Sequence, residues 1–580
     1  MKLFLASVAA LLIAATLSAP ALAETKLAAP TPVDSDQLKK VEDAAKAAQG
    51  SSDTAWMLMS TGLVLLMVPG LALFYGGMVR RKNILGTMMH SMVALAIIGI
   101  QWILFGYSLA FGETHGGIWG WSNDFLGLTG ILGPDGDGWV HKNFPGTNIP
   151  ILVHCMYQGM FAIITPALIS GAIAERIRFG PYCLFILLWA TFVYDPLAHW
   201  VWAVDSDGKF AGWLGKMGAL DFAGGTVVHV SAGLSGLAAI LVLRKRIGYP
   251  EHAMHPNSMV LTLTGAGLLW FGWFGFNGGS ALASNGQAGA ALAASQVAAA
   301  AAALSWMVAE WLHRGKPTAL GLASGIVAGL VAVTPASGYV TPLGALAIGL
   351  IAGAVCYVAV CLKPFCKYDD SLDAFGVHGV GGFLGAILTG LFANAVYIKA
   401  GAGPEAPIGV LDKGVGAQVL VQFTACAASV IFAFVVTYVL VLAIDRTWGF
   451  CLDNRGENEG LDRSQHNEVG FDLGPTLDLV SEQEPQEPRR ADVPPNGFKR
   501  FSVIVEGIKP KELKDLWSDL CQAGPKPPKP EFKAVYPFVT TVQGNRFTFR
   551  GGDPNAMRDN LTRLFELMLR GQPVRGRVEQ

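Results

Sequence analysis

Long apolar runs alternate with short polar segments along most of this 580-residue chain. A helix needs roughly 20 apolar residues to cross the hydrocarbon core of a bilayer. Eleven runs have about that length, near residues 54–79, 86–112, 149–174, 181–203, 223–243, 258–281, 287–312, 318–337, 341–363, 374–396 and 416–445. The pattern therefore predicts an all-α membrane bundle of eleven transmembrane helices. These helices are rich in Gly, Ala, Ser and Thr, which allow membrane helices to approach closely, so a compact bundle is expected.

The first 23 residues have the pattern of a secretory signal peptide. Lys2 supplies the positive charge, an apolar run follows, and Ala21-Leu22-Ala23 forms a small-x-small cleavage site. An uncleaved anchor is the alternative, for which the apolar run is short. Cleavage would leave residues 24–53, a polar and alanine-rich exported segment, outside the cytoplasm.

Loop charges support the same orientation. With an outer N-terminus and eleven spans, the C-terminus lies in the cytoplasm. The loops then assigned to the inside hold twelve Lys and Arg residues, namely Arg80, Arg81, Lys82, Arg176, Arg178, Arg244, Lys245, Arg246, Arg314, Lys316, Lys363 and Lys367. The outer loops hold five, namely Lys142, Lys209, Lys216, Lys399 and Lys413. This excess obeys the positive-inside rule, and a multi-pass protein of the inner (plasma) membrane is expected.

The character of the chain changes after the last apolar run, which closes the transmembrane domain at residues 54–445. Residues 446–472 are a polar tail, and residues 473–496 are a Pro- and Glu-rich linker. The apolar residues of segment 497–580 have the spacing expected of a strand, a helix, a hairpin and a second helix, in that order. That βαββα order predicts a small α+β domain on the cytoplasmic side.

Composition narrows the classes of function. The chain is 52% hydrophobic and only 15% charged, whereas soluble proteins carry about a quarter charged residues. The net charge of -1 indicates no particular partner, and without a basic patch no nucleic acid is expected. "CLKPFC" lacks the spacing and the histidines of a zinc site, and no catalytic motif is visible. We therefore expect no metal, no cofactor and no enzymatic activity.

An ionisable residue inside a membrane bundle is by default a functional hypothesis, and two histidines in the apolar runs stand out. His229 follows Asp221 by eight residues in the fifth run, roughly 12 Å along a helix. His378 follows Asp373 by five residues in the tenth run. Since these runs cross in opposite directions, runs one to five and six to ten are predicted to form an inverted repeat with a site near the midplane. Each histidine alone could be a core residue bonded to a carbonyl, but a matched, glycine-flanked pair favours a pore lining.

The two aspartates precede their helices. Carboxylates at that position satisfy free N–H groups, so helix capping is the expected role of both Asp221 and Asp373. A fixed negative charge near a cation entrance is compatible with capping.

Four long motifs carry a family resemblance. "YQGMFAIITPALISGAIAERIRFGPY", "GALDFAGGTVVHVSAG", "LLWFGWFGFNGGSAL" and "FGVHGVGGFLGAILTG" resemble the ammonium transporter family (Amt/Mep/Rh), over about residues 50–470. The resemblance implies a homotrimer in which each subunit of eleven helices has its own pore.

The resemblance also implies roles for matched positions. Trp202 and Ser280, with Phe161 beneath them, match the external substrate-binding site, and Phe161 and Phe276 match the rings that close the pore. His229 and His378 match the twin pore histidines, with a proton-relay role. Asp221 matches the family's acidic residue, with a structural or cation-attracting role. The implied function is recruitment of ammonium, its deprotonation, and conduction of ammonia through an apolar pore.

The polar tail after the last apolar run carries a further resemblance. "GLDRSQHNEVG" resembles the family's cytoplasmic tail, which couples to PII-type signal proteins, but Asn467 stands where glycine is usual and Val469 replaces an acidic residue. Asparagine can adopt the left-handed conformation that a turn needs.

The alternative function is an ammonium sensor that signals through the C-terminal domain, although no kinase or cyclase signature follows residue 490. A pore for another neutral gas is disfavoured by the match at Trp202 and Ser280.

Overall fold

The computed structural model describes residues 35–135, 138–471, 500–506, 508–522, 535–543, 545–550, 553–569 and 574–579. The chain divides into two compact units, of which the first ends at Gly470 and the second begins at Phe471. The predicted signal peptide (1–23), residues 24–34 of the exported segment and the linker (473–496) lie outside the described residues.

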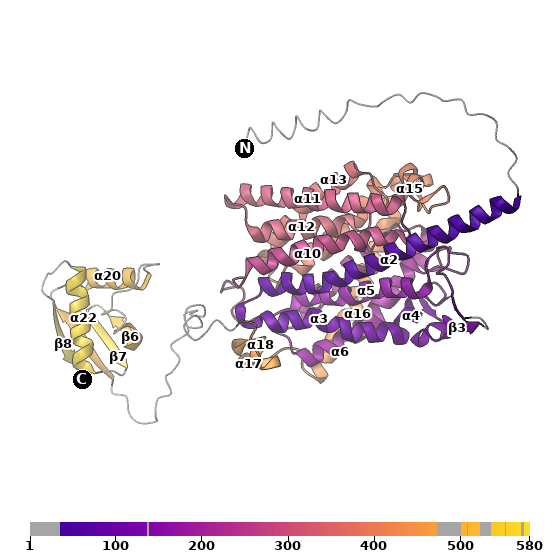
Figure 1. Ribbon diagram of the computed structural model, residues 1–580. Helices are drawn as coiled ribbons and strands as arrows, with labels where there is room; N and C mark the ends of the chain where they lie inside the picture. Colours follow the sequence, from indigo (N-terminus) through magenta and orange to yellow (C-terminus); the bar gives the residue numbers. More distant parts are fainter. Residues whose placement is uncertain are drawn as a thin grey trace, which may run out of the picture. The chain divides into compact units, whose positions relative to one another are not determined.

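The first unit is a bundle of apolar helical segments that run side by side (Figure 1). Ten segments of the described chain are long and apolar enough to cross a membrane, and α12 is a shorter apolar helix of 15 residues. Together they correspond to the eleven predicted runs. Uninterrupted helices are α2 (Ser35–Met78), α5 (Ile151–Ile173), α11 (Gly286–Arg314), α12 (Ala319–Val333), α13 (Pro342–Cys366) and α16 (Val415–Thr447).

The remaining spans are built from consecutive pieces. Span two comprises η1 (Arg81–Asn83), α3 (Ile84–Gln101), η2 (Trp102–Gly106) and α4 (Tyr107–Phe111). Span four comprises α6 (Phe179–Trp189), η4 (Ala190–Tyr194) and α7 (Asp195–Trp202). Span five comprises η5 (Gly225–Val230) and α9 (Ser231–Val242). Span six comprises α10 (Met259–Gly278) and η6 (Gly279–Ala281). Span ten comprises η7 (Phe375–Gly379) and α14 (Val380–Phe392).

Short elements connect the spans. Two antiparallel hairpins follow span two, β1 (Glu113–His115) with β2 (Trp119–Trp121) and β3 (Leu132–Asp135) with β4 (Gly138–His141). The other connecting elements are η3 (Asn123–Leu128), α8 (Trp213–Met217), α15 (Ala395–Ala402) and η8 (Leu411–Lys413).

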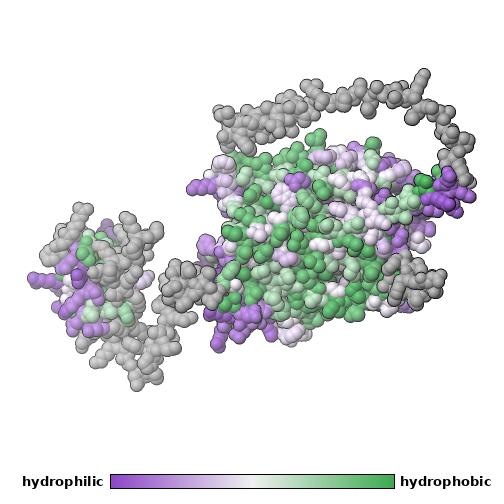
Figure 2. Space-filling view, in the orientation of Figure 1, coloured by the Kyte–Doolittle hydropathy of each residue, from purple (hydrophilic) through white to green (hydrophobic). Residues whose placement is uncertain are grey.

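The surface of the helical unit has the polarity that a bilayer requires. Figure 2 shows apolar residues over the middle of its visible side and hydrophilic residues gathered toward the two ends. Helix α2 also extends beyond its apolar run, because the polar residues from Ser35 onward are helical and mostly exposed. The described part of the predicted exported segment is therefore a continuation of the first transmembrane helix.

Glycines allow spans five and ten to cross in close contact. A Cβ atom on Gly233 would lie 2.1 Å from the backbone nitrogen of Gly379, and one on Gly382 would lie 2.9 Å from Cβ of His229. Each of these two glycines follows the histidine of its own helix by four residues, one turn along the same face. The crossing is thus made by equivalent positions of the two halves, as an inverted repeat requires.

The cap of span five is the carboxylate of Asp221. It accepts hydrogen bonds from the backbone N–H groups of Gly224 (2.8 Å), Gly225 (2.5 Å), Thr226 (2.8 Å) and Val227 (3.3 Å), and from the Thr226 hydroxyl. The expected helix cap is therefore present. A buried carboxylate satisfies the N–H groups that the first helical turn leaves without partners.

The prediction that Asp373 caps span ten is wrong, because Asp370 occupies that position. The carboxylate of Asp370 accepts hydrogen bonds from the N–H groups of Ala374 (3.1 Å) and Phe375 (2.8 Å), whereas Asp373 forms an ion pair with Lys363. Asp370 precedes His378 by eight residues, the same spacing that separates Asp221 from His229. The two halves of the repeat therefore share the same spacing between cap and histidine.

A network of largely buried ion pairs joins four loops at one end of the bundle. Arg246 contacts Glu175 (2.8 Å) and Asp369 (2.7 Å), Arg176 contacts Asp369 (2.7 Å), and Arg80 contacts Glu175 (3.0 Å). Burial alone raises the pKa of the Glu175 carboxyl, but Arg246 and Arg80 outweigh that effect and lower the pKa from 4.5 to about 2. The loops are thus held together by charges that have little access to water.

The tail of the first unit packs against this same end. Helices α17 (Asn454–Glu459) and α18 (Leu461–His466) are anchored by two acids. Asp462 accepts a hydrogen bond from the backbone N–H of Gly86 (2.8 Å), and Glu457 pairs with Arg244 (2.6 Å). Asn467 ends α18 in the left-handed conformation (φ 53°, ψ 34°), so the turn expected of a glycine is retained.

The described residues of the second unit form a four-stranded antiparallel sheet with two helices. Its strand order is β6-β7-β5-β8, and its buried core joins strand residues such as Val503 and Phe547 to Leu561 and Phe565. The elements are β5 (Arg500–Glu506), α20 (Pro510–Gln522), η9 (Tyr536–Phe538), β6 (Val539–Gln543), β7 (Arg546–Arg550), α22 (Pro554–Met568) and β8 (Arg575–Glu579). This is the βαββαβ, ferredoxin-like arrangement. The predicted βαββα order omitted β8, a short edge strand in which Val578 is the one large apolar side chain.

Candidate functional site

The two histidines predicted from the repeat meet inside the bundle. Their Nδ1 atoms are 3.3 Å apart, and the ring planes are nearly parallel, with centroids 5.3 Å apart. Both rings are buried, and each lies in a π-helical turn, η5 for His229 and η7 for His378. The structure thus brings together two residues that are 149 positions apart in the chain.

The contact between the Nδ1 atoms sets the tautomers. One nitrogen must carry a proton and donate, and the other must accept. In a neutral pair, the accepting ring then carries its proton on Nε2, while the donating ring has a free lone pair there. His229 Nε2 is buried and has no hydrogen-bond partner among the described residues. The pair can therefore offer both a donor and an acceptor to a small molecule.

Aromatic rings continue from the histidine pair toward Trp202. Phe276 lies 6.2 Å from His229 between centroids, and Phe161 stacks on Phe276 at 4.1 Å. Trp202 meets Phe161 edge-on at 6.1 Å. The rings from Trp202 to His378 form one unbroken series, and Phe161 and Phe276 lie together in the middle of it.

The polar groups at the Trp202 end leave two surfaces available. The indole Nε1–H of Trp202 donates to the backbone oxygen of Asp221 (2.9 Å), so the remaining recognition surface of the ring is its π face. Ser280 Oγ donates to the Phe276 oxygen (2.9 Å) and lies 3.1 Å from the hydroxyl of Tyr157. A serine hydroxyl that donates its single proton to a carbonyl keeps lone pairs that can accept N–H bonds.

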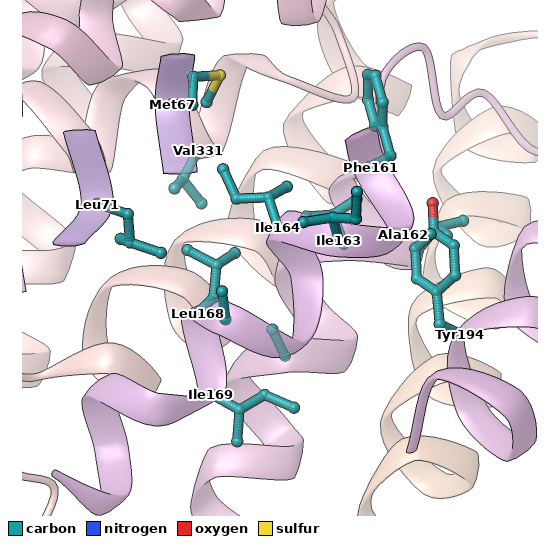
Figure 3. Close-up of a cluster of buried hydrophobic side chains, with 14 of the residues drawn as sticks. Met67, Leu71, Phe161, Ala162, Ile163, Ile164, Leu168, Ile169, Tyr194 and Val331 are labelled. Atoms are coloured by element: carbon teal, nitrogen blue, oxygen red, sulfur yellow. The ribbon is translucent and has the colours of Figure 1, made fainter. Parts of the chain in front are cut away.

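A narrow cavity lies beside the histidine pair. Both histidines, Phe276 and Trp273 line it together with aliphatic side chains. It offers about 10 Å³ for the centre of a water molecule, close to the space that one water needs. Figure 3 shows part of the aliphatic wall, with Met67, Leu71, Ile164 and Leu168 arranged along the same buried cluster as Phe161. The cavity admits one small molecule and gives a hydrated cation few groups that could replace its water.

Tyr157 and Trp273 belong to this site and were not identified from the sequence. Tyr157 donates to the backbone oxygen of Phe276 (2.7 Å) and packs against Phe161. The ring of Trp273 stacks on His229 at 5.5 Å, and its indole N–H donates to Thr334 (2.9 Å). Their spacing was a usable signal, because Tyr157 is four residues before Phe161 and Trp273 three residues before Phe276, on one helix face in each case.

The fold and the site define a multi-pass membrane protein with an apolar, ring-lined path that contains a histidine pair. A family model described as the Ammonium Transporter Family matches residues 55–471. The chain belongs to this family. Among the residues described, no group of three or more His, Cys, Asp or Glu side chains is arranged to hold a metal ion.

Relatives and solved structures agree with this assignment. The chain is 46% identical to an ammonium transporter of Mycobacterium tuberculosis, covering 73% of this chain and 90% of the relative. It is 45% identical to ammonium transporter Amt1 of Archaeoglobus fulgidus, covering 72% and 99%. The crystal structure of Candida albicans Mep2 is similar with a TM-score of 0.63 and 35% identity, covering 70% of this chain and 87% of Mep2. A structure called Sensor Amt Protein is similar with a TM-score of 0.64 and 27% identity, covering 72% and 99%.

Proposed function

We propose that this protein is an ammonium transporter that takes up ammonium at Trp202, removes a proton from it, and conducts ammonia past His229 and His378. The observation that supports this most directly is the unbroken series of rings that joins these three residues. Family membership makes ammonium the substrate of choice.

Recruitment uses the two surfaces left available at the Trp202 end. A cation is attracted to the π face of an indole ring. The lone pairs of Ser280 accept N–H bonds from the same ion, because its own proton is donated to Phe276. The carboxylate of Asp221 is occupied by backbone N–H groups and by the Thr226 hydroxyl, so its role is to hold the mouth of span five and to supply a fixed negative charge.

The paired rings of Phe161 and Phe276 act as a gate that separates this site from the cavity. Their stacking at 4.1 Å leaves no space between them, so a rotation of at least one ring must accompany passage. A bare cation in the apolar cavity beyond would lose its water and find few replacements, which is costly. Ammonium avoids this cost by giving up a proton and crossing as neutral ammonia.

The histidine pair provides the relay for that proton. Ammonia can donate to the unprotonated Nε2 of one ring and accept from the Nε2–H of the other. A proton that arrives at one Nε2 can be passed through the Nδ1–Nδ1 contact and leave from the other ring, which exchanges the two tautomers. Neutral imidazoles perform this role without placing a lasting charge in the membrane.

The setting of the site follows from the sequence and the tail. We propose a homotrimer in the inner membrane, with a cleaved signal peptide, an outer N-terminus and a cytoplasmic C-terminus. A PII-type signal protein is the proposed partner at the cytoplasmic face. The left-handed turn at Asn467 supports that partner, because the backbone shape of the tail signature is kept despite the changed residue.

A sensor function is the alternative, and the Sensor Amt Protein neighbour makes it a specific one. A sensor needs the Trp202 end of the site to bind ammonium, but it does not need a path that continues beyond that end. The continuation of the rings and the cavity to His378 favours transport.

Current recording on a solid-supported membrane tests the proposal. Purified protein in liposomes receives a jump in ammonium or in potassium concentration. Wild-type protein should give an ammonium current and no potassium current. The double variant H229L/H378L should lose the relay and with it the discrimination between the two ions. The exposed loop variant H255L is the control and should behave as wild type. A double variant that moves ammonium at the wild-type rate and excludes potassium would contradict the relay, and a wild type that binds ammonium without current would favour the sensor.

A further inference from the structure

The sheet of the C-terminal unit has one covered face and one open face. Val503 and Val505 of β5 and Phe547 and Phe549 of β7 are buried in a core that they share with α20 and α22. Successive side chains of a strand point to opposite faces. The alternate residues of the same strands therefore lie on the face that no described helix covers.

Three described arginines lie on that open face, together with Glu506 and Glu579. In the register of the sheet, Ile504 of β5 lies between Arg546 of β7 and Arg577 of β8, and Glu506 lies opposite Arg575. Thr548 pairs with Ser502 in the next row. The strand positions of Arg500 and Arg550, which are opposite one another in the register, belong to the same alternating set.

The arrangement already holds an anion. Arg546 and Arg577 approach the Glu579 carboxylate from two sides, at 2.6 Å and 2.9 Å. The two guanidinium side chains remain 50% and 64% exposed. Guanidinium groups bind carboxylate and phosphate oxygens with the same forked geometry, so further anions can be bound at their exposed edges.

The charge of this region differs from that of the rest of the chain. Residues 497–580 contain 15 Lys and Arg and 9 Asp and Glu, so their net charge is +6. Residues 1–496 contain 27 Lys and Arg and 34 Asp and Glu, so their net charge is -7. The nearly neutral total therefore conceals a basic C-terminal unit, and the fold gathers part of its arginines on one uncovered sheet face.

We infer that the open face of the C-terminal sheet binds the anionic phosphate headgroups of the bilayer that surrounds the helical unit. The 28 residues from 472 to 499 join the tail of the helical unit to β5, and even fully extended they span at most about 95 Å, so the sheet stays tethered to a membrane-spanning chain. Arginines near an anionic leaflet are attracted to it, and the single apolar side chain in the row, Ile504, is compatible with an interfacial position. Single-stranded RNA fits less well, because its bases stack on aromatic rings and the described side chains of this face include none.

Arginine footprinting on the full-length protein tests the inference without any substitution. The protein is placed in nanodiscs of phosphatidylcholine alone, or of phosphatidylcholine with phosphatidylglycerol, and treated with phenylglyoxal. Mass spectrometry then gives the modification rate at each arginine. We expect the rates at Arg546, Arg575 and Arg577 to fall several-fold in the anionic discs and to recover at high salt, which screens exposed charges. Arg558 and Arg563 of α22, on the helical layer, should react equally in both discs.

Two matched variants and two competitors separate the remaining outcomes. R575E/R577E should abolish the protection of Arg546, whereas R558E/R563E, with the same change in charge, should retain it. Equal rates in both discs, or equal protection of the α22 arginines, would overturn the inference. Single-stranded RNA or inorganic phosphate is also added to the protein in phosphatidylcholine discs. If either protects the sheet arginines as much as phosphatidylglycerol does, or more, the inference is overturned, because the lipid would then not be the preferred ligand.

Discussion

Replacement of Asp221 by alanine is expected to destabilise the start of span five by about 4.5 kcal/mol. The carboxylate is buried and accepts three close backbone hydrogen bonds, at 2.5 to 2.8 Å, from consecutive residues. A hydrogen bond to a charged group contributes about 1.5 kcal/mol or more, and a buried donor left without a partner incurs a similar cost. The longer bond from Val227 and the rotatable hydroxyl of Thr226 are left out of this sum.

Asparagine at the same position should cost about half as much, because one acceptor oxygen remains and the other is replaced by a donor. The bond from the Trp202 indole goes to the backbone oxygen of Asp221, so both variants retain it. A loss of transport that exceeds the loss of folded protein would then report the missing negative charge rather than a displaced Trp202.

The assay compares apparent melting temperatures of purified wild type, D221A, D221N and D412A in one detergent, together with ammonium currents from liposomes. Asp412 lies in an exposed turn, and its replacement should change neither quantity. The expected order of stability is wild type and D412A, then D221N, then D221A. Equal melting temperatures for D221A and wild type would refute the reasoning, since the freed N–H groups would then have found other partners at no cost.

Three further predictions concern packing, charge and domain organisation. G233A should abolish folded protein, because its Cβ would lie 2.1 Å from the backbone of Gly379, whereas G267A in α10, with open space around it, should fold normally. The yield of monodisperse protein on size exclusion measures both, and a normal yield of G233A protein would disprove the close crossing. E175Q should destabilise the protein by about 3 kcal/mol near neutral pH, since it leaves Arg246 and Arg80 short of a buried partner. Because the pKa of Glu175 is lowered from 4.5 to about 2, the stabilisation by its carboxylate is complete above about pH 4.5 and is lost as the pH falls toward 2. The difference in melting temperature between wild type and E175Q should therefore shrink over that range. A constant difference would contradict the role of the charged carboxylate in these ion pairs. A stop codon after Pro495 should leave the proposed trimer and the ammonium current intact, and a smaller assembly than that of the full-length protein would mean that the C-terminal unit supports the membrane bundle.

The membrane fold could be predicted from sequence because its main requirement is local. Each span must be apolar over its own length, so α5 (Ile151–Ile173) and α16 (Val415–Thr447) are visible as runs without knowledge of their neighbours. The pair His229 and His378 was also predictable, since a polar residue in an apolar run is a local anomaly and its recurrence in the opposite half suggested a shared site.

Residues whose roles depend on distant partners were beyond sequence reasoning. Asp370 and Asp373 are equally plausible caps in the sequence, and the choice depends on how the chain enters η7 and on the position of Lys363. The spacing of Tyr157 and Trp273 places them on the helix faces of Phe161 and Phe276, but their roles follow only from the positions of Ser280 and His229 beside them.

The sequence by itself determined the number of spans, the apolar character of the bundle and the positions of His229 and His378 in spans five and ten, because hydrophobicity and the cost of burying a polar group act on each segment separately. The tertiary structure alone decided the 3.3 Å contact between those histidines, the capping role of Asp370, the ion pairs of Glu175, and the arginine face of a C-terminal sheet that includes the unpredicted strand β8. Each of these depends on which segments cross or pair, and that is set by packing among residues far apart in the chain.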